Sequence, residues 1–401
     1  MKYTFLTTLI PKELEKIINE NSRNNMQDAA SALQWNIYRG LKENVSESIT
    51  ICNILPIGSY PQYYKKAFIK TTLFSDNIEK HKNIAFCNIK LIRKKSIENN
   101  VYKTLKKKIG TEEEWLFVYT LSASFLRAIY KLKRKKTNLK VCAIVADLPN
   151  MADLSNKKSL LKRFYQKITA NNCYKYMFCV DAFVLLTAQM AEYMKIDKPF
   201  CVMEGIATKP EMDEPPTYKT EKTIFYSGTL HKRFGIDVLL EAFSLISDKD
   251  YRLILCGIGD SEEKIKDMAK VDSRICFLGK IPREEVLQKQ KQATVLVNPR
   301  QNKEAFTKYS FPSKTMEYLA SGIPVVAYKL DGIPTEYDNY IQYVFEDTPH
   351  ALANKLMEIC ESSVDLRKEI GMKAQQFIYN EKNAQKQAKK IIDLIKLVDE
   401  L

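Results

Sequence analysis

The stretch Tyr309-Ser-Phe-Pro-Ser-Lys-Thr-Met-Glu-Tyr-Leu-Ala-Ser-Gly-Ile-Pro-Val-Val-Ala327 decides the fold of this 401-residue chain. Ser313 is predicted to cap a helix, and the free amides of the first turn, with the charge of Lys314, suit a phosphate. Glu317, one turn further, can reach toward a pair of sugar hydroxyls near the same helix start. Gly322 ends the helix before a buried strand. The alternative is an ordinary helix-to-strand connection with Lys314 and Glu317 on the surface.

The rest of the chain alternates between short apolar β-prone stretches and helical patterns. In the first half the expected strands are 3–9, 48–55, 83–89, 115–119, 140–145 and 182–186. Two helices are expected at 26–43 and 122–135. A second series begins at 223 with strands at 223–226, 251–256, 274–278, 294–297, 324–327 and 341–345. This order predicts an α/β protein with two Rossmann-like, doubly wound domains that face each other across a cleft, where ligands bind in this class.

The acidic, proline-rich stretch around 207–217 has little to bury and separates the two series. We therefore expect a first domain at 1–206, a linker at 207–222, a second domain at 223–380 and a final helix at 381–401. That helix is long for its position in the second domain alone, and could cross back to brace the first.

Composition favours a globular protein without metal. Hydrophobic residues make up 45% and charged residues 28%, with a mean hydropathy of −0.31. No apolar run reaches the length of a spanning helix, and the stretch 3–10 is too short for a secretion signal, so a cytosolic location is expected. Nine cysteines without a CxxC pair and only three histidines argue against a zinc site and for reduced thiols.

Positive charge is concentrated in one half of the chain. Residues 1–200 carry a net charge of +17, and the remainder carries −2. The basic clusters are Lys65-Lys66, 93–95, 106–108, 131–136 and 157–163. Such an excess indicates a partner rich in phosphates, which is either an anionic membrane surface or a nucleic acid. A solvated basic face without a specific partner is the remaining alternative.

Several stretches resemble the retaining glycosyltransferases of family 4, which have the two-domain GT-B fold, and in particular the branch that builds bacterial capsular polysaccharides and exopolysaccharides. The strongest match runs from Phe311 to Val326. Weaker matches are 201–206, 226–237, 255–260 and 297–300. The glycine turn 257–259 is weak by itself, because it follows strands in many α/β proteins.

The chain also departs from the family's pattern. The first of the family's two glutamates, eight residues before Glu317, is Tyr309, and two positions that often carry cations are Thr229 and Phe234. The histidine-aspartate pair of the first domain appears as Ala146-Asp147. A glycine pair near the amino terminus appears as Asn24-Asn25, and asparagine also tolerates left-handed backbone geometry. These departures bear on the identity of the donor sugar more than on the reaction class.

The resemblance implies roles for particular residues. Lys232 and Arg233 are expected to stabilise the leaving diphosphate together with the amides of Gly228, Ser313 and Lys314. Glu317 is expected on the ribose, and Asp147 as an orienting group or base for the acceptor hydroxyl. The remaining residues expected around the donor are Thr229, Gly257, Tyr309, Pro312, Gly332 and Ile333. No metal and no cofactor are expected beyond the co-substrate, a nucleoside diphosphate sugar that is expected to be UDP-linked.

The leading hypothesis is therefore transfer of a hexosyl or N-acetylhexosaminyl unit, with retention, to a lipid-linked saccharide at the inner membrane surface. This makes the expected protein a peripheral one on the cytoplasmic side. A nucleic-acid-binding protein is the competing class, but no RNP, KH or zinc-finger pattern is present, and the aromatic residues do not form a basic stacking platform. A sugar-nucleotide epimerase on the same fold is a third reading, since fold alone does not fix function.

Overall fold

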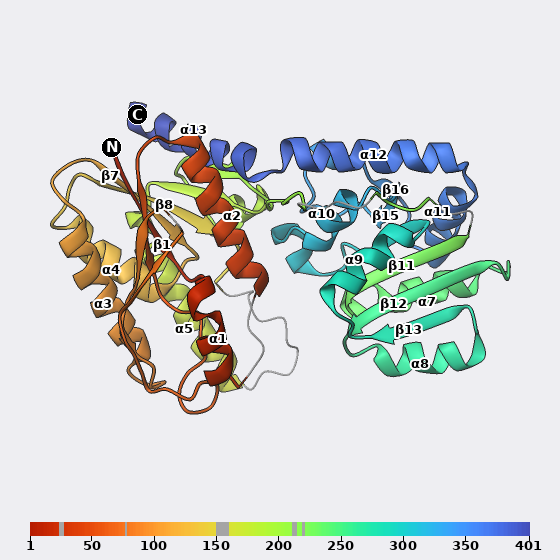
Figure 1. Cartoon of the computed structure of the whole chain (residues 1–401), viewed down its shortest axis with the longest axis horizontal. Coiled ribbons are helices and arrows are strands. Elements are labelled where there is room, and N and C mark those ends of the chain that lie inside the picture. Colours follow the sequence, from red (N-terminus) through yellow and green to blue (C-terminus); the bar gives the residue numbers. More distant parts are fainter. Residues whose placement is uncertain (24–27, 77, 150–159, 211–214, 219–220) are drawn as a thin grey trace. The chain divides into compact units, whose positions relative to one another are not determined.

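The computed structural model describes residues 1–23, 28–76, 78–149, 160–210, 215–218 and 221–401; for residues 28 and 160–167 only the backbone is described (Figure 1). The asparagine pair 24–25 and residues 157–159 of the last basic cluster therefore lie outside the described residues. The chain divides into two compact units, Met1–Ile206 with Ala384–Leu401 (unit 1) and Ala207–Asn383 (unit 2). Each unit is built on a largely parallel sheet, which confirms the α/β fold class.

The described residues of unit 1 form ten strands and the helices that connect them. In chain order its elements are β1 (Lys2–Thr7), α1 (Lys12–Asn21), α2 (Asp28–Asn44), β2 (Ile49–Asn53), β3 (Phe68–Ile69), β4 (Thr72–Ser75), β5 (Lys80–Asn83), β6 (Phe86–Cys87), α3 (Arg93–Lys108), β7 (Glu114–Tyr119), α4 (Ala123–Lys133), β8 (Leu139–Val145), α5 (Leu160–Tyr176), η1 (Met177–Cys179), β9 (Ala182–Leu185), α6 (Gln189–Met194), β10 (Phe200–Val202) and α13 (Ala384–Glu400).

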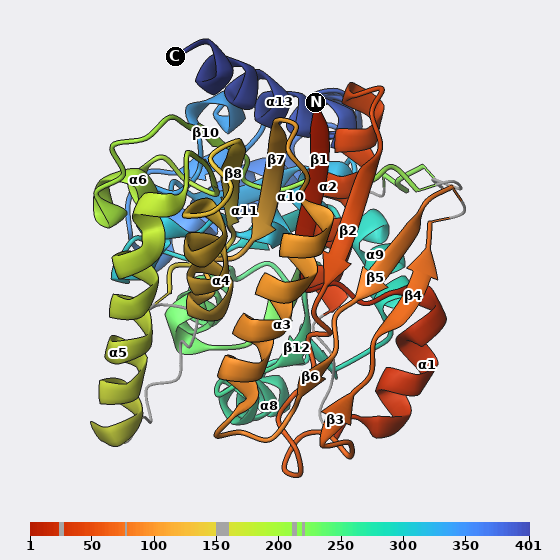
Figure 2. The ribbon, with the colours of Figure 1, turned by 90° about the vertical axis from the view of Figure 1, so that its left-hand side faces the viewer.

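The main sheet of unit 1 has the strand order β10-β9-β8-β7-β1-β2-β5-β4 (Figure 2). Tyr3 at the start of β1 aligns with Ile49 of β2 on one side and with Trp115 of β7 on the other. All pairs are parallel except β4 with β5, and every residue of β7 is buried, as expected for strands covered on both faces. The carboxyl ends of the parallel strands consequently meet at one edge of the sheet, where ligand sites form in this class.

The single strand expected at 83–89 is wrong. The structure has two short strands there, β5 ending at Asn83 and β6 beginning at Phe86, and they belong to different sheets. Both flanking asparagines are buried and bonded to other segments: Asn83 accepts a hydrogen bond from Asn53 at 2.6 Å, and Asn88 donates one to the Gly58 carbonyl at 2.9 Å. These side-chain bonds, which periodicity does not reveal, turn the chain out of the main sheet.

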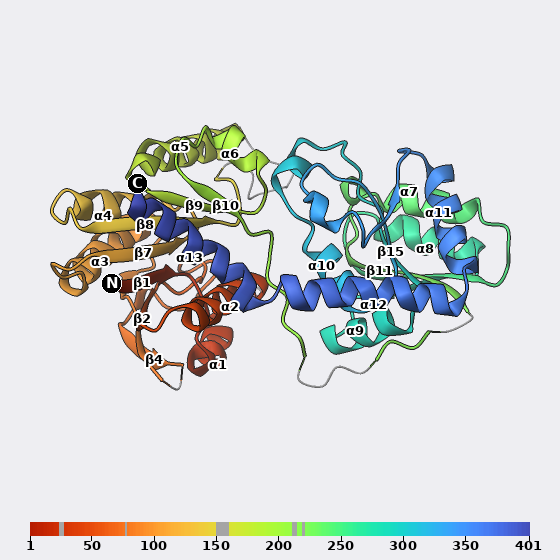
Figure 3. The ribbon, with the colours of Figure 1, turned by 90° about the horizontal axis from the view of Figure 1, so that it is seen from above.

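The last helix, α13, packs along α2 within unit 1 (Figure 3). The two backbones approach closely at Gly40, where an added Cβ would lie only 2.1 Å from the carbonyl oxygen of Ala384. Asn44 donates to the Gln385 carbonyl at 2.9 Å, and Ala388, Ile391 and Ile395 are buried in the core of the unit. The amphipathic face of α13 is therefore part of the hydrophobic core of unit 1.

Unit 2 holds the second βα series. Its elements are β11 (Lys222–Thr229), η2 (Lys232–Phe234), α7 (Ile236–Ser244), β12 (Tyr251–Ile258), α8 (Glu262–Val271), β13 (Ile275–Gly279), α9 (Arg283–Gln292), β14 (Val295–Asn298), η3 (Ala305–Tyr309), α10 (Ser313–Ala320), β15 (Val325–Tyr328), η4 (Thr335–Tyr337), β16 (Gln342–Val344), α11 (Pro349–Glu361) and α12 (Val364–Glu381).

The sheet of unit 2 has the order β13-β12-β11-β14-β15-β16, and all of its strands are parallel. The stretch expected as a linker is bonded to this unit where it is described. The amide of Ala207 donates to the Lys382 carbonyl at 2.8 Å, and the Tyr218 hydroxyl donates to the Gly322 carbonyl at 2.8 Å. Gly322, the residue that Tyr218 contacts, lies in the turn that follows α10.

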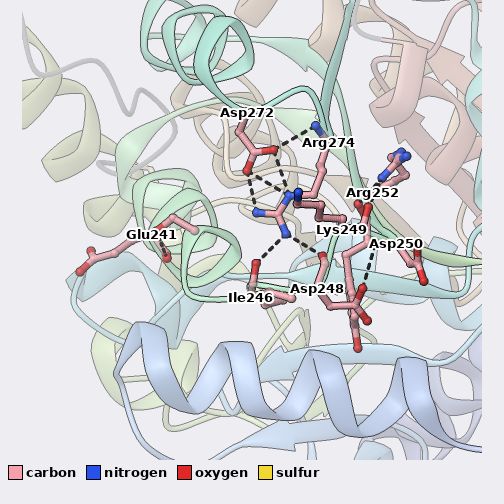
Figure 4. Close-up of polar contacts among 10 residues, drawn as sticks. Glu241, Ile246, Asp248, Lys249, Asp250, Arg252, Asp272 and Arg274 are labelled. Carbon is pink, nitrogen blue, oxygen red and sulfur yellow. Dashed lines mark hydrogen bonds and ion pairs between the residues drawn. The ribbon is translucent and has the colours of Figure 1, made fainter.

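Arg274 ties together the loops at the amino-terminal edge of this sheet (Figure 4). Its guanidinium donates to the carbonyls of Ile246 at 2.6 Å and Asp248 at 2.8 Å, and lies 2.7 Å from a carboxylate oxygen of Asp272. The Arg274 hydrogen bond comes first among the causes that lower the pKa of Asp272, and partial burial opposes it. Because this edge is opposite the carboxyl ends of the strands, where ligands bind in this class, Arg274 is a structural residue.

The basic cluster 131–136 is largely occupied by internal contacts. Lys131 forms an ion pair with the buried Glu98, Lys133 lies 2.6 Å from Asp181, and Lys136 donates to the Gly110 carbonyl at 3.0 Å. Lys131 and Lys133, which were expected to meet a phosphate-rich partner, thus have carboxylate partners within unit 1. Among the described residues, no helix has the length and apolar character needed to cross a membrane.

Candidate active site

Glycines bring the carboxyl ends of β11 and β12 into backbone contact. Gly228 and Gly257 are register partners in the two strands, and a Cβ on Gly257 would lie 1.7 Å from the carbonyl oxygen of Gly228. A Cβ on Gly259 would lie 2.1 Å from the carbonyl oxygen of Leu230. Side chains are thus excluded from this edge, so that a ligand can approach the backbone amides that follow the strands.

The loop after β11 carries the two cations expected on the diphosphate. Thr229 ends the strand, and Lys232 and Arg233 lie in the 3₁₀ turn η2 directly after it. The Lys232 side chain is exposed, and its backbone amide donates to a carboxylate oxygen of Asp260 at 3.0 Å. Burial raises the pKa of Asp260, but this bond and the contact with His231 outweigh it and lower the pKa overall. The carboxylate of Asp260 therefore holds the loop in place.

A third cation, Arg300, lies under this loop and was not singled out from the sequence. It follows β14 at the carboxyl edge, and only 7% of the residue is exposed. The guanidinium lies 4.4 Å from the ring centre of Phe306 and 5.5 Å from that of Phe234. One amino group donates to the Ser310 hydroxyl at 2.8 Å, whereas Nε has no hydrogen-bond partner among the described residues.

Arg300 is also close to the backbone of the glycine loop. A Cβ on Gly235, whose φ is +83°, would lie 1.9 Å from the Pro299 oxygen and 3.2 Å from the Arg300 amide. No ion pair joins Arg300 to a carboxylate in the described part of the chain; burial lowers its pKa to about 10. A buried cation without a counter-ion is costly unless an anion joins it. A cation immediately after a buried strand was the signal by which the sequence could have revealed it.

The start of α10 differs from the expected capping. Pro312, with an extended backbone, is the N-cap residue, and Ser313 is already the first helical residue. The prediction that Ser313 caps the helix is therefore wrong, because the chain enters helical geometry one residue earlier. The amides of Ser313 and Lys314 still belong to the first turn of the helix, which is where an anion is favoured.

Glu317 is the centre of a polar network in unit 2. Its carboxylate accepts hydrogen bonds from Lys314 and from Gln290, each at 2.7 Å, and lies 3.3 Å from Arg283. Burial raises the pKa of Glu317, but the charge and hydrogen bond of Lys314, with Gln290 and Arg283, lower it overall. The charge of Lys314 is thus directed at Glu317, whereas the buried Arg300 has no carboxylate partner among the described residues.

Gln290 connects this network to β11. It is fully buried and donates to the Ser227 hydroxyl at 3.1 Å as well as to Glu317. Tyr318 exchanges hydrogen bonds with the backbone amide and carbonyl of Ser227 at 2.8 and 2.9 Å. These bonds fix the side chain of Glu317 relative to the glycine edge. They join distant parts of the sequence, since Ser227 and Tyr318 are 91 residues apart.

The loop that contains Gly332 and Ile333 packs on η3, the 3₁₀ turn that ends at Tyr309. A Cβ on Gly332 would lie 2.5 Å from the Thr307 oxygen and 2.7 Å from the Ser310 oxygen. Ile333 is buried in the hydrophobic core, so only its backbone remains for a ligand. Glu336 lies 2.6 Å from the fully buried Lys382, which gives it a structural role.

Asp147, the expected acceptor residue, belongs to unit 1. It follows β8 at the carboxyl edge of that sheet and is exposed to solvent. Surrounding protein atoms nevertheless desolvate the carboxylate and raise its pKa above the ordinary value of 3.8. Thr120, at the neighbouring end of β7, has a φ of +70°, which is rare for a β-branched residue and typical of functional loops.

The fold, and most of unit 2, are similar to known proteins. Residues 208–377 match the family described as Glycosyl transferases group 1. Over the whole chain, the structure is similar to sucrose-phosphate synthase from Thermosynechococcus elongatus, with a TM-score of 0.65, 13% identity and 100% of both chains covered. It is also similar to TarM of S. aureus in complex with UDP, with a TM-score of 0.59, 11% identity and 98% and 99% of the two chains covered. The fold is GT-B.

A curated relative comes from Corynebacterium glutamicum. This D-inositol 3-phosphate glycosyltransferase is 28% identical over 153 residues, which are 35% of this chain and 35% of that protein. The matched region thus spans about a third of the relative's length. Together with the family match in unit 2, this similarity links the chain to glycosyltransferases of the group 1 type.

Proposed function

We propose that the chain transfers a hexosyl or N-acetylhexosaminyl unit from a nucleoside diphosphate sugar, expected to be UDP-linked, to a saccharide acceptor, with retention of configuration. The observation that carries the proposal is the buried Arg300, which has no carboxylate partner in the described part of the chain and lies beside the glycine loop that follows β11. A diphosphate is the anion that such an edge of an α/β sheet accommodates.

The charges suit the departure of a nucleoside diphosphate. When the bond between the sugar carbon and the β-phosphate oxygen breaks, negative charge grows on that oxygen. Arg300, Lys232 and Arg233, with the amides of the glycine loop and of the first turn of α10, supply positive charge that is fixed before the reaction. The acceptor hydroxyl then bonds to the sugar carbon, and Asp147 orients this hydroxyl or takes its proton.

The acceptor is proposed to be a lipid-linked saccharide in the synthesis of a capsule or exopolysaccharide, which places the protein peripherally on the inner face of the membrane. Support comes from the resemblance of 311–326 to that branch and from the net charge of +17 in residues 1–200. A basic protein is attracted to an anionic membrane surface, so it would encounter an acceptor anchored in that membrane more often. Turnover of a panel of nucleoside diphosphate sugars, with and without a lipid-diphosphate saccharide, tests this proposal.

Glu317→Ala should weaken the binding of a nucleoside diphosphate by about 1–3 kcal/mol, because a hydrogen-bonded carboxylate proposed to hold the ribose is lost. Inorganic diphosphate, which has no ribose, should bind the variant nearly as well as the parent protein. Calorimetric titration with both ligands measures the difference. Glu285→Ala, which removes an exposed carboxylate from α9, is the control. Equal affinity of parent and Glu317→Ala for all nucleoside diphosphates would refute the ribose assignment.

Activity should persist in the presence of EDTA, because Arg300, Lys232 and Arg233 supply the charge that a divalent ion provides in other transferases. The initial rate measured after dialysis against the chelator should equal the rate in its absence. A complete loss of activity that Mg²⁺ or Mn²⁺ restores would mean that these cations do not suffice for the leaving group.

A further inference from the structure

Two segments of unit 1 that are separated in sequence form one surface. β3 and β6 pair antiparallel, with Phe68 opposite Cys87. The Asn88 amide donates to the Ala67 carbonyl at 2.7 Å, and the Tyr60 amide donates to the Asn88 carbonyl at 3.0 Å. Figure 2 shows β3 and β6 at the end of the unit where α3 begins. The segments 57–73 and 86–96 are therefore held together by backbone bonds.

Large apolar side chains on this surface are exposed. Leu91 is 92% exposed and Phe68 is 69% exposed, and Ile92, next to Leu91, is also exposed. Single exposed apolar residues are common on any protein. Here three of them lie on two segments that are bonded to each other, which is the arrangement found at interaction sites.

The same two segments are strongly basic. They contain seven lysines and arginines and no aspartate or glutamate. Arg93 and Lys95 are occupied by the Ile57 carbonyl and Glu98, respectively. Lys66, Lys70 and Lys90 are exposed. Positive charge that surrounds exposed apolar side chains matches the boundary between anionic headgroups and acyl chains.

We infer that this surface docks on an anionic lipid bilayer, with Phe68, Leu91 and Ile92 entering the interface and Lys66, Lys70 and Lys90 contacting headgroup phosphates. We call these six residues the lipid-docking surface. A nucleic acid would use the lysines but gives the aliphatic Leu91 and Ile92 no stacking partner. The inference rests on the proposed function, because it explains how the protein reaches a lipid-linked acceptor. In this inference the lipid-docking surface contacts the membrane, and the ion-paired lysines of α4 do not.

The location fits such an acceptor. β2 ends at Asn53 before the first segment, and α3 begins at Arg93 within the second, so both segments lie at the carboxyl edge of the unit 1 sheet. Asp147 follows β8 at the same edge. A saccharide whose lipid remains in the bilayer would thus meet unit 1 on the side where the proposed acceptor residue lies.

Sedimentation with vesicles of phosphatidylglycerol and phosphatidylcholine in equal parts tests the lysines. The variant with Lys66→Glu, Lys70→Glu and Lys90→Glu should bind at least about 100-fold more weakly, since each lysine near such a surface contributes about fivefold. The control carries the same charge change at the other end of α3, as Lys103→Glu, Lys106→Glu and Lys107→Glu, and should retain most of the binding. Equal losses of vesicle binding in both variants would mean that binding depends only on the net charge of the protein, which would overturn the inference.

Insertion of the apolar side chains is tested by fluorescence. The chain has two tryptophans, both outside this surface, at 35 and 115. Leu91→Trp should add an emission that shifts to shorter wavelength when these vesicles are added. Val271→Trp, at a position 90% exposed in unit 2, should give no shift. The absence of a shift for Leu91→Trp, or binding to RNA in preference to the vesicles, would overturn the inference.

Binding of a nucleoside diphosphate separates this inference from the proposed function. The triple glutamate variant should bind UDP as the parent protein does, because all three lysines belong to unit 1. If UDP fails to bind the parent protein while the vesicles are captured, the proposed function fails and the surface stands. If UDP binds and the vesicles are not captured, the surface fails alone.

Discussion

Arg300→Met should lower kcat/KM for sugar transfer by about 10²- to 10³-fold, the typical loss when one preorganised group that stabilises developing charge is removed. The affinity for a nucleoside diphosphate should fall by at least about 30-fold, since a buried charge partner of the ligand is lost. Methionine is chosen because its unbranched thioether side chain can keep apolar contacts with Phe306 and Phe234, the rings that Arg300 contacts. Steady-state kinetics and calorimetric titration measure the two effects.

The ligand-free Arg300→Met variant should be no less stable than the parent protein. Because Arg300 is buried without a carboxylate partner among the described residues, replacement by an apolar side chain should leave the free energy of unfolding unchanged or raise it. Added UDP should then raise the melting temperature of the parent protein but not that of the variant.

Arg274→Met is the matched control. Arg274 bonds to two backbone carbonyls and to Asp272 at the amino-terminal edge of the sheet, so its loss should lower the melting temperature while UDP affinity is retained. If Arg300→Met instead destabilised the free protein and kept its affinity for UDP, Arg300 would be a structural residue like Arg274, and the proposed diphosphate site would lose its main support.

Asp147→Asn should lower kcat/KM by about 10²- to 10⁴-fold if the carboxylate takes the acceptor proton, as is typical of a general base. Only the ionised carboxylate accepts a proton. Because desolvation raises the pKa of Asp147, activity of the parent protein should fall as the pH drops through a value above 3.8, the ordinary pKa. The acidic limb of the pH-rate profile should be absent from the residual activity of the variant.

Two controls accompany the Asp147 variant. UDP affinity should be unchanged, since Asp147 belongs to unit 1 and the proposed donor residues belong to unit 2. Asp197→Asn, which changes an exposed carboxylate of unit 1, should leave the profile as it is. An Asp147→Asn variant with full activity and the same acidic limb would exclude Asp147 from proton transfer.

Local signals in the sequence predicted most of the elements near the proposed donor site. The stretch 309–327 predicted a helix and a following buried strand, and the structure has α10 at Ser313–Ala320 and β15 at Val325–Tyr328. Glycines 228 and 257 were placed at strand ends, where the backbone approach of β11 and β12 requires them. Such features depend on hydrophobic periodicity and on the backbone freedom of glycine. Both are local properties that can be read from neighbouring residues in the sequence.

Long-range side-chain contacts were not predicted. The bond from Gln290 to Glu317, the ion pair that occupies Lys131, and the split of the expected strand 83–89 each join residues that are distant in sequence or depend on a buried amide. Periodicity does not distinguish a free lysine from a paired one, because both occupy the polar face of a helix.

The sequence by itself determined that this is an α/β protein of two βα series, since the alternation of strands and helices and the glycine turns are local properties of the chain. Only the tertiary structure decided which charges are available. It left Arg300 buried without a carboxylate partner among the described residues, and it joined Gln290 to Glu317. It also exposed Leu91 beside Lys90, because burial and pairing depend on which distant segments fold against each side chain.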